Sequence, residues 1–274
     1  MKKFSYNRRV WGEEDASLSV FSWASLKLGY ILTALENVRG KVLDLGCGGG
    51  AYTRGIKNYR SDFHITGVDI SKKSITYARK KDGDINYVLG SVYSLPFNKN
   101  FFDAVVSIDA LEHFDNPSKA FKEVYRVLKP GGVFHFALPL EGDARTLMGL
   151  IYRLTGVNLK ENQVGHVARF TYKEILEIAK SAGFRFVSNR FSVHGIIQIF
   201  DFINSAMIAA MGGNSHEPDF SLEKHVVKGN RKLLKIFVIP YKVILLIHFL
   251  ESKLFSRIIG YSVNMTVKKH GKSI

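Results

Sequence analysis

An aspartate and a run of glycines stand together near the start of the chain, at residues 42–50 (VLDLGCGGG). Asp44 comes at the end of an apolar run, and the glycines after it carry no side chains, so the bare backbone can approach a ligand closely. A second acid, Asp69, ends the next apolar run, and its carboxylate could accept hydrogen bonds from both hydroxyls of a ribose. The spacing therefore predicts a nucleoside-binding site.

The charge of Asp44 bears on which ligand the loop suits. Gly46, Gly48 and Ala51 also fit the dinucleotide pattern Gly-x-Gly-x-x-Ala, so a nicotinamide-dependent oxidoreductase is one alternative. An anion beside the glycines repels a pyrophosphate, however, and suits a ligand that bears an ammonium and a sulfonium. We therefore favour such a cationic ligand over a dinucleotide.

A second group of reactive side chains lies at residues 109–113 (DALEH). If Asp109 opens a helix, Glu112 and His113 follow three and four residues later, so all three could face the mouth of the cofactor cleft. Such a group could hold a divalent metal, but no fourth ligand is identifiable, and we predict no metal. The preferred interpretation is that Glu112 and His113 are structural or orient the substrate, with His113 also a candidate general base.

A further histidine, His166, precedes an expected helix start at Thr171. An imidazole at the cleft would suit proton removal, because histidine titrates near neutral pH. The alternative is a histidine that fastens its loop by hydrogen bonds. We take Glu112, His113 and His166 as the candidate catalytic residues.

The elements that must position these residues alternate along the chain between short apolar strands and helical segments. Strands are expected at residues 41–45, 64–68, 85–89, 102–108, 132–138, 184–191 and 261–268. Helices are expected at residues 52–59, 71–81, 118–128 and 172–182. This alternation predicts an α/β fold with a doubly wound, mostly parallel, seven-stranded sheet, which residues 261–268 close as an edge strand.

Several of these segments together resemble class I S-adenosylmethionine-dependent methyltransferases. Residues 42–50 and 68–71 resemble the first two motifs of that superfamily, and residues 90–97 resemble the adenine-contacting turn after the third strand. Ser91 stands in that turn where families often have Asp or Asn. Residues 102–113 and 127–132 resemble the fourth strand and the helix and turn after it, most closely in the quinone-biosynthesis and small-molecule branch.

The resemblance implies a Rossmann-like methyltransferase fold, S-adenosyl-L-methionine as cofactor, and methyl transfer to an oxygen, nitrogen or carbon nucleophile. Much of the acceleration would come from holding donor and acceptor at near-attack distance, and a base is needed only for protonated nucleophiles. The expected cofactor-binding residues are Asp44, Gly46, Cys47, Gly48, Gly50, Asp69, Ile70, Ser91, Val92 and Ile108.

The positive charge of the chain is concentrated near its C-terminal end. The formal net charge is +15, and residues 222–274 hold eleven cationic side chains against two acids. Two apolar segments nearby, residues 195–213 and 233–250, do not fit the α/β repeat, and neither reads as a transmembrane helix. We expect an apolar, basic helical insertion or lid that rests on an anionic membrane and admits a hydrophobic acceptor. A subdomain packed on itself, or a dimer interface, is the alternative.

Composition and segment order give the expected organisation. Hydrophobic residues at 46% and charged residues at 23% are ordinary for a soluble domain, and one cysteine excludes an internal disulfide. Without a signal-peptide core near residue 1, we expect a cytoplasmic protein, peripheral on the inner face of the membrane. The expected parts are an N-terminal helical cover (1–40), the methyltransferase core (41–193), the helical insertion (194–259), and a closing edge strand with a tail (260–274).

Two further classes of function remain open at this point. A methyltransferase for RNA or DNA would use the same positive charge to hold phosphates. The chain lacks an Asn/Asp-Pro-Pro-Tyr segment after the fourth strand and any recognisable nucleic-acid module, so we do not expect a nucleic-acid partner. The other is a catalytically silent cofactor-binding protein that serves as a partner for another chain.

Overall fold

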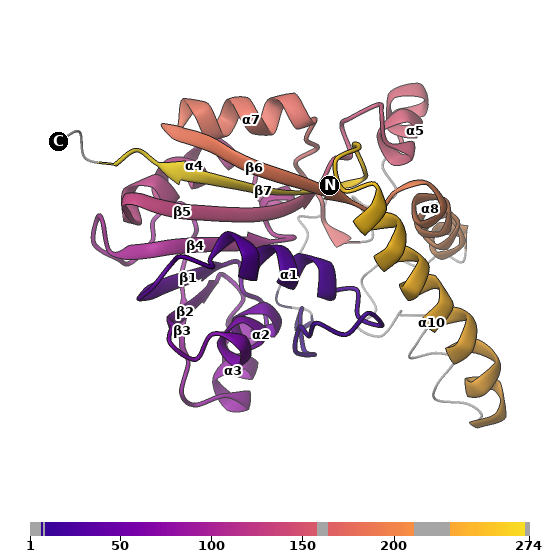
Figure 1. Cartoon of the computed structure of the whole chain (residues 1–274), viewed down its shortest axis with the longest axis horizontal. Helices are drawn as coiled ribbons and strands as arrows, with labels where there is room; N and C mark the ends of the chain where they lie inside the picture. Colours follow the sequence, from indigo (N-terminus) through magenta and orange to yellow (C-terminus); the bar gives the residue numbers. More distant parts are fainter. Residues whose placement is uncertain (1–6, 8, 158–163, 211–230, 272–274) are drawn as a thin grey trace.

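The computed structural model describes residues 7, 9–157, 164–210 and 231–271, which form a seven-stranded sheet between helices (Figure 1). The strands are β1 (Lys41–Leu45), β2 (His64–Asp69), β3 (Asn86–Leu89), β4 (Phe102–Ile108), β5 (Leu128–Pro139), β6 (Phe184–Ser192) and β7 (Ser262–Lys269). The helices are α1 (Ser25–Ala34), α2 (Ala51–Tyr59), α3 (Lys72–Lys81), α4 (Pro117–Val127), α5 (Leu147–Thr155), α7 (Tyr172–Ser181), α8 (Gly195–Ala210) and α10 (Arg231–Leu254). A short 3₁₀ turn, η1 (Leu111–His113), follows β4.

The strand order is β3-β2-β1-β4-β5-β7-β6. Strands β1 to β5 pair in parallel, and β7 pairs antiparallel with both β5 and β6. This confirms the predicted doubly wound, mostly parallel sheet. The prediction that residues 261–268 form an edge strand is wrong, because β7 lies inside the sheet and β6 forms the edge. Residues 262–267 are all buried. The alternation of residue types along this strand therefore does not mean that one of its faces is open to solvent.

Alternate residues of the central strands point to opposite faces of the sheet, and each face has its own hydrophobic core. Leu43 and Val105 pack in the core that α4 and α7 cover. Val42 and Val106 pack in the core on the other face, which α1, α2 and α3 cover. The near-continuous apolar runs of β1 and β4 follow from this burial on both faces.

Helix α3 begins where the sequence predicted, and α4 begins one residue before its predicted start at residue 118. Ser71 caps α3, and its hydroxyl accepts a hydrogen bond from the backbone N–H of Ser74 at 3.2 Å. Helix α4 has Pro117 at its first position, and the side chain of Asn116 caps it. Of the predicted N-terminal helical cover, only α1 is helical among the described residues, and residues 9–24 contain no helix.

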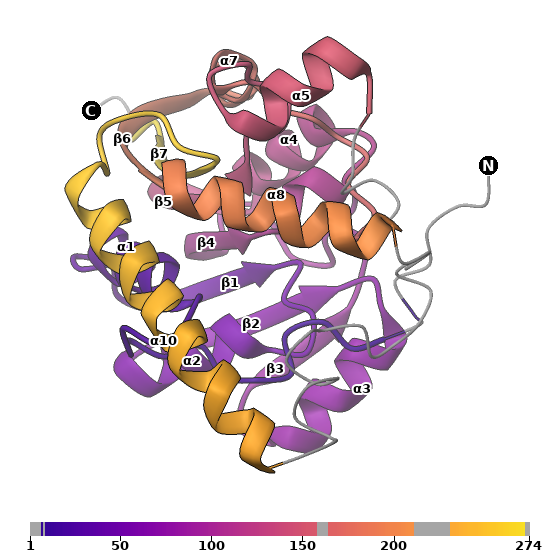
Figure 2. The ribbon, with the colours of Figure 1, turned by 90° about the vertical axis from the view of Figure 1, so that its right-hand side faces the viewer.

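Helices α5, α8 and α10 gather at one end of the sheet, on the right in Figure 1. This is the carboxyl end of the parallel strands, because α5 follows β5, α8 follows β6, and α10 leads into β7 where Ser262 pairs with Pro139 and Ser192. Figure 2, turned so that this end faces the viewer, shows α8 and α10 in front of the strands. Within the predicted insertion (194–259), residues 195–210 and 231–254 are helical, and residues 194 and 255–259 are not; residues 211–230 lie outside the described residues. No helix in the described ranges is long and apolar enough to cross a bilayer.

A buried histidine in β5 makes stability depend on pH. His135 is 2% exposed, its Nδ1 lies 2.9 Å from Oγ1 of Thr266, and burial lowers the pKa of its imidazole from 6.5 to about 3. As the pH falls below 6.5, the unfolded chain binds a proton that the folded chain does not, so stability falls. For His135→Gln, we expect the loss of unfolding free energy between about pH 6.5 and about pH 5 to be smaller by about 1.5 kcal/mol.

Urea denaturation of both proteins at the two pH values measures this difference. His64→Gln, at an exposed histidine of β2, is the matched control and should lose as much stability as the unsubstituted chain. Equal losses in His135→Gln and the unsubstituted chain would show that His135 does not stay neutral in the folded state.

Candidate active site

The glycine loop between β1 and α2 folds back against the end of β2. Gly46, Gly48 and Gly50 have φ values of 75°, 53° and 89°, a region that residues with a side chain rarely adopt. The backbone N–H groups of Gly46 and Cys47 both donate to the carbonyl oxygen of Val68, at 2.8 and 3.0 Å. The loop therefore holds its shape by backbone contacts at the carboxyl ends of two neighbouring strands, where open α/β sheets bind ligands.

Asp69, at the end of β2, ties the loop to the start of α3. Its Oδ2 accepts a hydrogen bond from Gly48 N–H at 2.8 Å, and its Oδ1 accepts one from Ser71 N–H at 2.7 Å. Burial raises the pKa of this carboxyl group, and the two backbone bonds oppose the rise. Each oxygen keeps a lone pair that can accept a further hydroxyl. The neighbouring Ile70 is 62% exposed, so the carboxylate fits a vicinal diol beside an apolar surface.

Asp44 lies behind the loop. It is 2% exposed, and its Oδ2 accepts a hydrogen bond from Oγ1 of Thr53 in α2 at 2.6 Å. Burial raises the pKa of Asp44 to about 7, with the Thr53 bond lowering it and the charge of Asp69 raising it further. A cation bound nearby would favour the ionised form. The predicted contact of Asp44 with the cofactor stays a prediction.

The other predicted cofactor residues differ in what they can offer. The thiol of Cys47 packs on β2, because a Cβ placed at Gly67 would lie 2.8 Å from its Sγ, so only the backbone of Cys47 is left for a ligand. The hydroxyl of Ser91 accepts the backbone N–H of Tyr93 at 3.3 Å within its own turn. Val92 and Ile108 are buried apolar side chains, at 8% and 7% exposure, that can contribute only apolar contact.

The N-terminal segment, expected as part of a helical cover over residues 1–40, runs along the same loop without helical structure at residues 9–24. The carbonyl oxygen of Trp11 accepts a hydrogen bond from Gly49 N–H at 2.6 Å, and a Cβ placed at Gly48 would lie 2.6 Å from that oxygen. The guanidinium of Arg9 lies 3.2 Å from the ring centroid of Trp11. The absence of side chains at positions 48 and 49 therefore also allows this segment to pack close to the loop.

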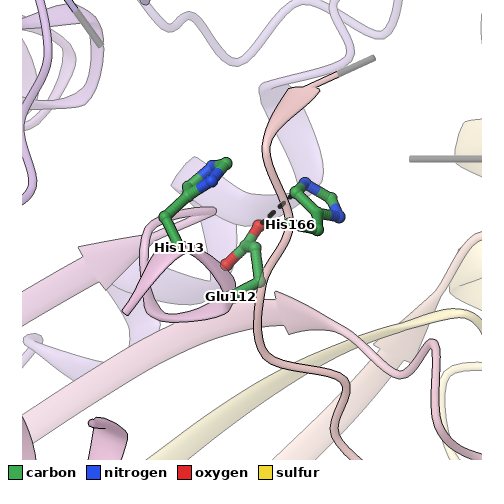
Figure 3. A group of neighbouring side chains, drawn as sticks. All are labelled: Glu112, His113 and His166. Atoms are coloured by element: carbon green, nitrogen blue, oxygen red, sulfur yellow. Dashed lines mark ion pairs between the residues drawn. The ribbon is translucent and has the colours of Figure 1, made fainter. Parts of the chain in front are cut away.

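Glu112, His113 and His166 come together beside the loop, and we call them the Glu–His cluster. One possible ligand atom from each residue lies within 4.8 Å of the others, and His166 Nε2 is 3.8 Å from Glu112 Oε1. Figure 3 shows Glu112 between the two rings, with Glu112 and His113 on one turn and His166 on another segment. A Cβ placed at Gly46 would lie 2.6 Å from the Cβ of Ala110, so the turn that carries the cluster packs on the glycine loop.

Backbone bonds hold the two segments of the cluster together. The carbonyl oxygen of Glu112 accepts the N–H groups of Val167 and Ala168, both at 2.9 Å. His113 Nδ1 lies 3.0 Å from the carbonyl oxygen of Gly165, which can only accept, so this nitrogen carries the proton. The loop before α7 therefore brings His166 to η1, a contact that no pattern in the sequence indicated.

Two residues that the sequence reasoning missed orient His166. Its Nδ1 lies 2.7 Å from Oε1 of Glu141, and the hydroxyl of Tyr261 donates to the same oxygen at 2.7 Å. Both Glu141 and Tyr261 are buried. Glu141 could have been found from the sequence, because it follows the carboxyl end of β5. Asp69 and Glu112 were already expected at this edge of the sheet.

The burial of Glu112 sets the electrostatics of the cluster. Its side chain is 1% exposed, and no hydrogen-bond partner for its Oε2 lies among the described residues. Burial raises the pKa of Glu112, while the charge of His166 opposes the rise and that of Asp109 adds to it. Burial also lowers the pKa of His113. The cluster thus combines a carboxyl group and two imidazoles in a site largely closed to solvent.

The expectation that Asp109 shares a face with Glu112 and His113 is wrong. Asp109 has a φ of 50°, and η1 begins two residues later, so the three side chains do not follow one helical face. The carboxylate of Asp109 is 44% exposed and pairs with the ammonium of Lys27, 2.6 Å from its Oδ1. His166 takes the place in the cluster that the sequence suggested for Asp109.

Comparison with known sequences gives one family match within the core. Residues 43–136 match a family model described as a methyltransferase domain. A sterol 24-C-methyltransferase of Gibberella zeae is 38% identical over 100 residues, 34% of this chain and 26% of that protein. Malonyl-[acyl-carrier protein] O-methyltransferase of Pectobacterium atrosepticum is 30% identical over 126 residues, 46% of this chain and 49% of that protein. The matched parts thus span about a quarter to about half of these relatives.

Solved structures share the fold over most of the chain. Phosphoethanolamine N-methyltransferase 2 of Haemonchus contortus, in complex with S-adenosyl-L-methionine, superposes with a TM-score of 0.56 and 20% identity, covering 92% of this chain and 53% of that one. The [4+2]-cyclase SpnF superposes with a TM-score of 0.56 and 18% identity, covering 96% and 87%. Since one of these names is not that of a methyltransferase, the fold alone does not assign the reaction.

Proposed function

We propose that this chain, which carries a class I S-adenosylmethionine-dependent methyltransferase domain, transfers a methyl group to a small or lipid-like acceptor. One observation carries the proposal: the Asp69 carboxylate and the glycine loop, which fit a nucleoside, lie at the same edge of the sheet as the Glu–His cluster. A donor site beside a group of proton acceptors is what methyl transfer to a hydroxyl or amine requires.

The residues at the loop have separate tasks in binding the cofactor. S-adenosylmethionine supplies, when bound, an electrophilic methyl group on its sulfur. Asp69 accepts the two ribose hydroxyls on the lone pairs that Gly48 and Ser71 leave open. The exposed Ile70 offers apolar contact, and Asp44 provides a buried carboxylate that a cationic ligand would hold ionised.

The Glu–His cluster acts on the acceptor. Glu141 and Tyr261 hold the ring of His166, and the carbonyl of Gly165 holds that of His113, so both imidazoles are fixed before an acceptor arrives. Fixed rings avoid the entropy cost of ordering them in the complex. A hydroxyl or amine acceptor would meet this cluster on the side opposite the leaving thioether.

The class of acceptor follows from the relatives and from the surface near the site. The matching proteins act, by their names, on a sterol and on malonyl-[acyl-carrier protein]. The test is to incubate the purified chain with S-[methyl-³H]-adenosylmethionine and separate panels of sterols, phenols and fatty acyl compounds. RNA is added as a further sample. Label in an organic-phase product from at least one panel supports the proposal, whereas label only in the RNA would favour the nucleic-acid alternative.

The helices at the carboxyl end of the sheet present apolar stripes to solvent. On α8, Ile196, Ile199 and Ile203 are 61%, 53% and 51% exposed, at positions that share one helical face. Helix α10 repeats the pattern with a second stripe next to cationic side chains. The stripe consists of Val243, Leu246, Leu250 and Leu254, and the exposed cations near it are Lys242, Lys253 and Arg257.

We propose that this face rests on an anionic lipid surface, at the cytoplasmic side of a membrane. Exposed apolar stripes on two helices that contact each other exceed what scattered surface residues would give. The flanking lysines and arginine, in a chain of net charge +15, complement anionic headgroups. Because the face lies at the same end as the site, a lipid-like acceptor could reach the Glu–His cluster without crossing water.

Binding to vesicles measures this. We expect the chain to sediment with phosphatidylcholine vesicles that contain phosphatidylglycerol, and Ile199→Glu with Leu250→Glu to lower the bound fraction by about tenfold or more, since each loses apolar burial and adds a like charge. Val187→Glu, at an exposed valine of the edge strand β6, is the matched control. Absence of vesicle binding, or a dimer that these substitutions dissociate, would contradict a lipid surface.

A further inference from the structure

We propose that Glu112, His113 and His166 bind one divalent transition-metal ion. The three ligand atoms lie within 4.8 Å of one another and come from two segments that backbone bonds hold in place. The role of such an ion, to hold an oxygen of the acceptor, rests on the proposed function; its binding does not.

The outer hydrogen bonds of both histidines are those of metal ligands. A metal-bound imidazole usually donates its other N–H to a carbonyl or a carboxylate, which fixes the ring and its tautomer. His113 directs Nδ1 to the carbonyl of Gly165 at 3.0 Å, and His166 directs Nδ1 to Glu141 at 2.7 Å. With Nδ1 protonated, the neutral form of each ring has its unprotonated nitrogen at Nε2. Tyr261, which donates to Glu141, fixes the carboxylate as well.

The third residue, Glu112, supplies a buried carboxyl group with one oxygen unsatisfied among the described residues, and a bound cation would favour its ionised form. Glu112 is 1% exposed, and its Oε2 is buried with no hydrogen-bond partner within the described part of the chain. A buried polar atom without a partner is costly and calls for an explanation such as an ion. The nearest cationic candidate, His166, lies 3.8 Å from Oε1, which is beyond a hydrogen bond. A divalent cation would satisfy the carboxylate.

The spacing and the donor types indicate which ions fit. Bonds of about 2.1 Å place neighbouring ligand atoms about 3 to 3.5 Å apart, so shifts of about an ångström in the side chains would close the site. Two imidazole nitrogens and one carboxylate suit zinc, manganese or iron(II) better than calcium or magnesium, which prefer all-oxygen sites. Three protein ligands leave positions open for water or for an acceptor oxygen.

A purely structural network makes a different prediction. The rings of His113 and His166 lie 5.0 Å apart in a T-shaped contact, and together with Glu141 they could simply fasten the loop before α7. In that case the cluster would bind no metal, and substitutions in it would change only stability. Direct metal binding therefore separates the two.

The experiment is calorimetric titration of the chelator-treated, full-length, tag-free chain with zinc chloride and, separately, manganese chloride. We expect one ion to bind per chain with an affinity on the order of micromolar or tighter for zinc. Glu112→Gln and His166→Gln should each weaken zinc binding by about 100-fold or more, since each removes a ligand. His64→Gln, at an exposed histidine outside the cluster, should leave it unchanged.

S-adenosylhomocysteine binding to the same samples keeps this result apart from the proposed function. Zinc binding that only the cluster substitutions weaken supports the site, whether or not S-adenosylhomocysteine binds. No binding of zinc or manganese, or binding that Glu112→Gln and His166→Gln leave unchanged, overturns it. Because the two substitutions lie on different segments, a failure of one variant to fold leaves the other to decide.

Discussion

Replacing Asp69 with alanine is expected to weaken S-adenosylhomocysteine binding by about 30- to 900-fold, or ~2–4 kcal/mol. The substitution would remove two charge-assisted hydrogen bonds that the carboxylate accepts from the ribose hydroxyls. Its present partners, Gly48 N–H and Ser71 N–H, would also lose their acceptor, so the loop would be less well held for the ligand. Isothermal titration calorimetry of both proteins measures the change.

Two further variants of the chain test whether the Asp69 result is specific. Asp69→Asn keeps an oxygen for one of the two backbone donors but removes the charge, so its loss should be smaller than that of Asp69→Ala. Asp84→Ala removes an exposed aspartate before β3 and should bind like the unsubstituted chain. If Asp69→Ala is folded by circular dichroism and binds with unchanged affinity, Asp69 is not the ribose ligand.

Replacing His166 with alanine is expected to lower kcat for methyl transfer by about 100- to 10,000-fold. The Glu–His cluster would lose the ring that Glu141 and Tyr261 hold, whether that ring acts on the acceptor directly or through a bound ion. Affinity for S-adenosylhomocysteine should change little, because His166 makes no contact with the glycine loop among its described hydrogen bonds. Single-turnover transfer to the acceptor found in the labelling screen measures the rate.

The control for His166 is His64→Ala, an exposed histidine on β2. A variant His166→Ala that retains full turnover would remove His166 from the chemistry. A variant that loses cofactor binding and turnover together, with a lowered melting temperature, would instead assign His166 the structural task of fastening its loop.

The fold was largely predictable because burial on both faces leaves a strong pattern. The strand at residues 102–108 was predicted with the bounds that β4 has, and the cap Ser71 marked the start of α3. The position of β7 was not predictable in this way. Alternation identifies a strand but not its neighbours, and the pairing of β7 with both β5 and β6 depends on contacts seventy or more residues apart in sequence.

The site was predictable only where a predicted strand places its residues. Glu112 and His113 follow β4, so their place at the carboxyl edge came from the strand itself. His166 was found as an isolated histidine, and its meeting with Glu112 depends on bonds from Val167 and Ala168 to a carbonyl of η1. Tyr261 reaches Glu141 from just before the start of the neighbouring strand β7, 120 residues away in sequence. Such tertiary contacts leave no periodic signal, and the wrong placement of Asp109 arose because a 3₁₀ turn replaced the expected helix.

The most direct test of the account is calorimetric titration of the purified chain with S-adenosylhomocysteine, with NAD as the matched nucleotide. We expect binding at one site with an affinity on the order of micromolar for S-adenosylhomocysteine and no heat from NAD, since the buried carboxyl group of Asp44 behind the glycine loop disfavours a pyrophosphate. Binding of NAD in its place, or of neither ligand, would contradict the assignment of this chain as an S-adenosylmethionine-dependent methyltransferase.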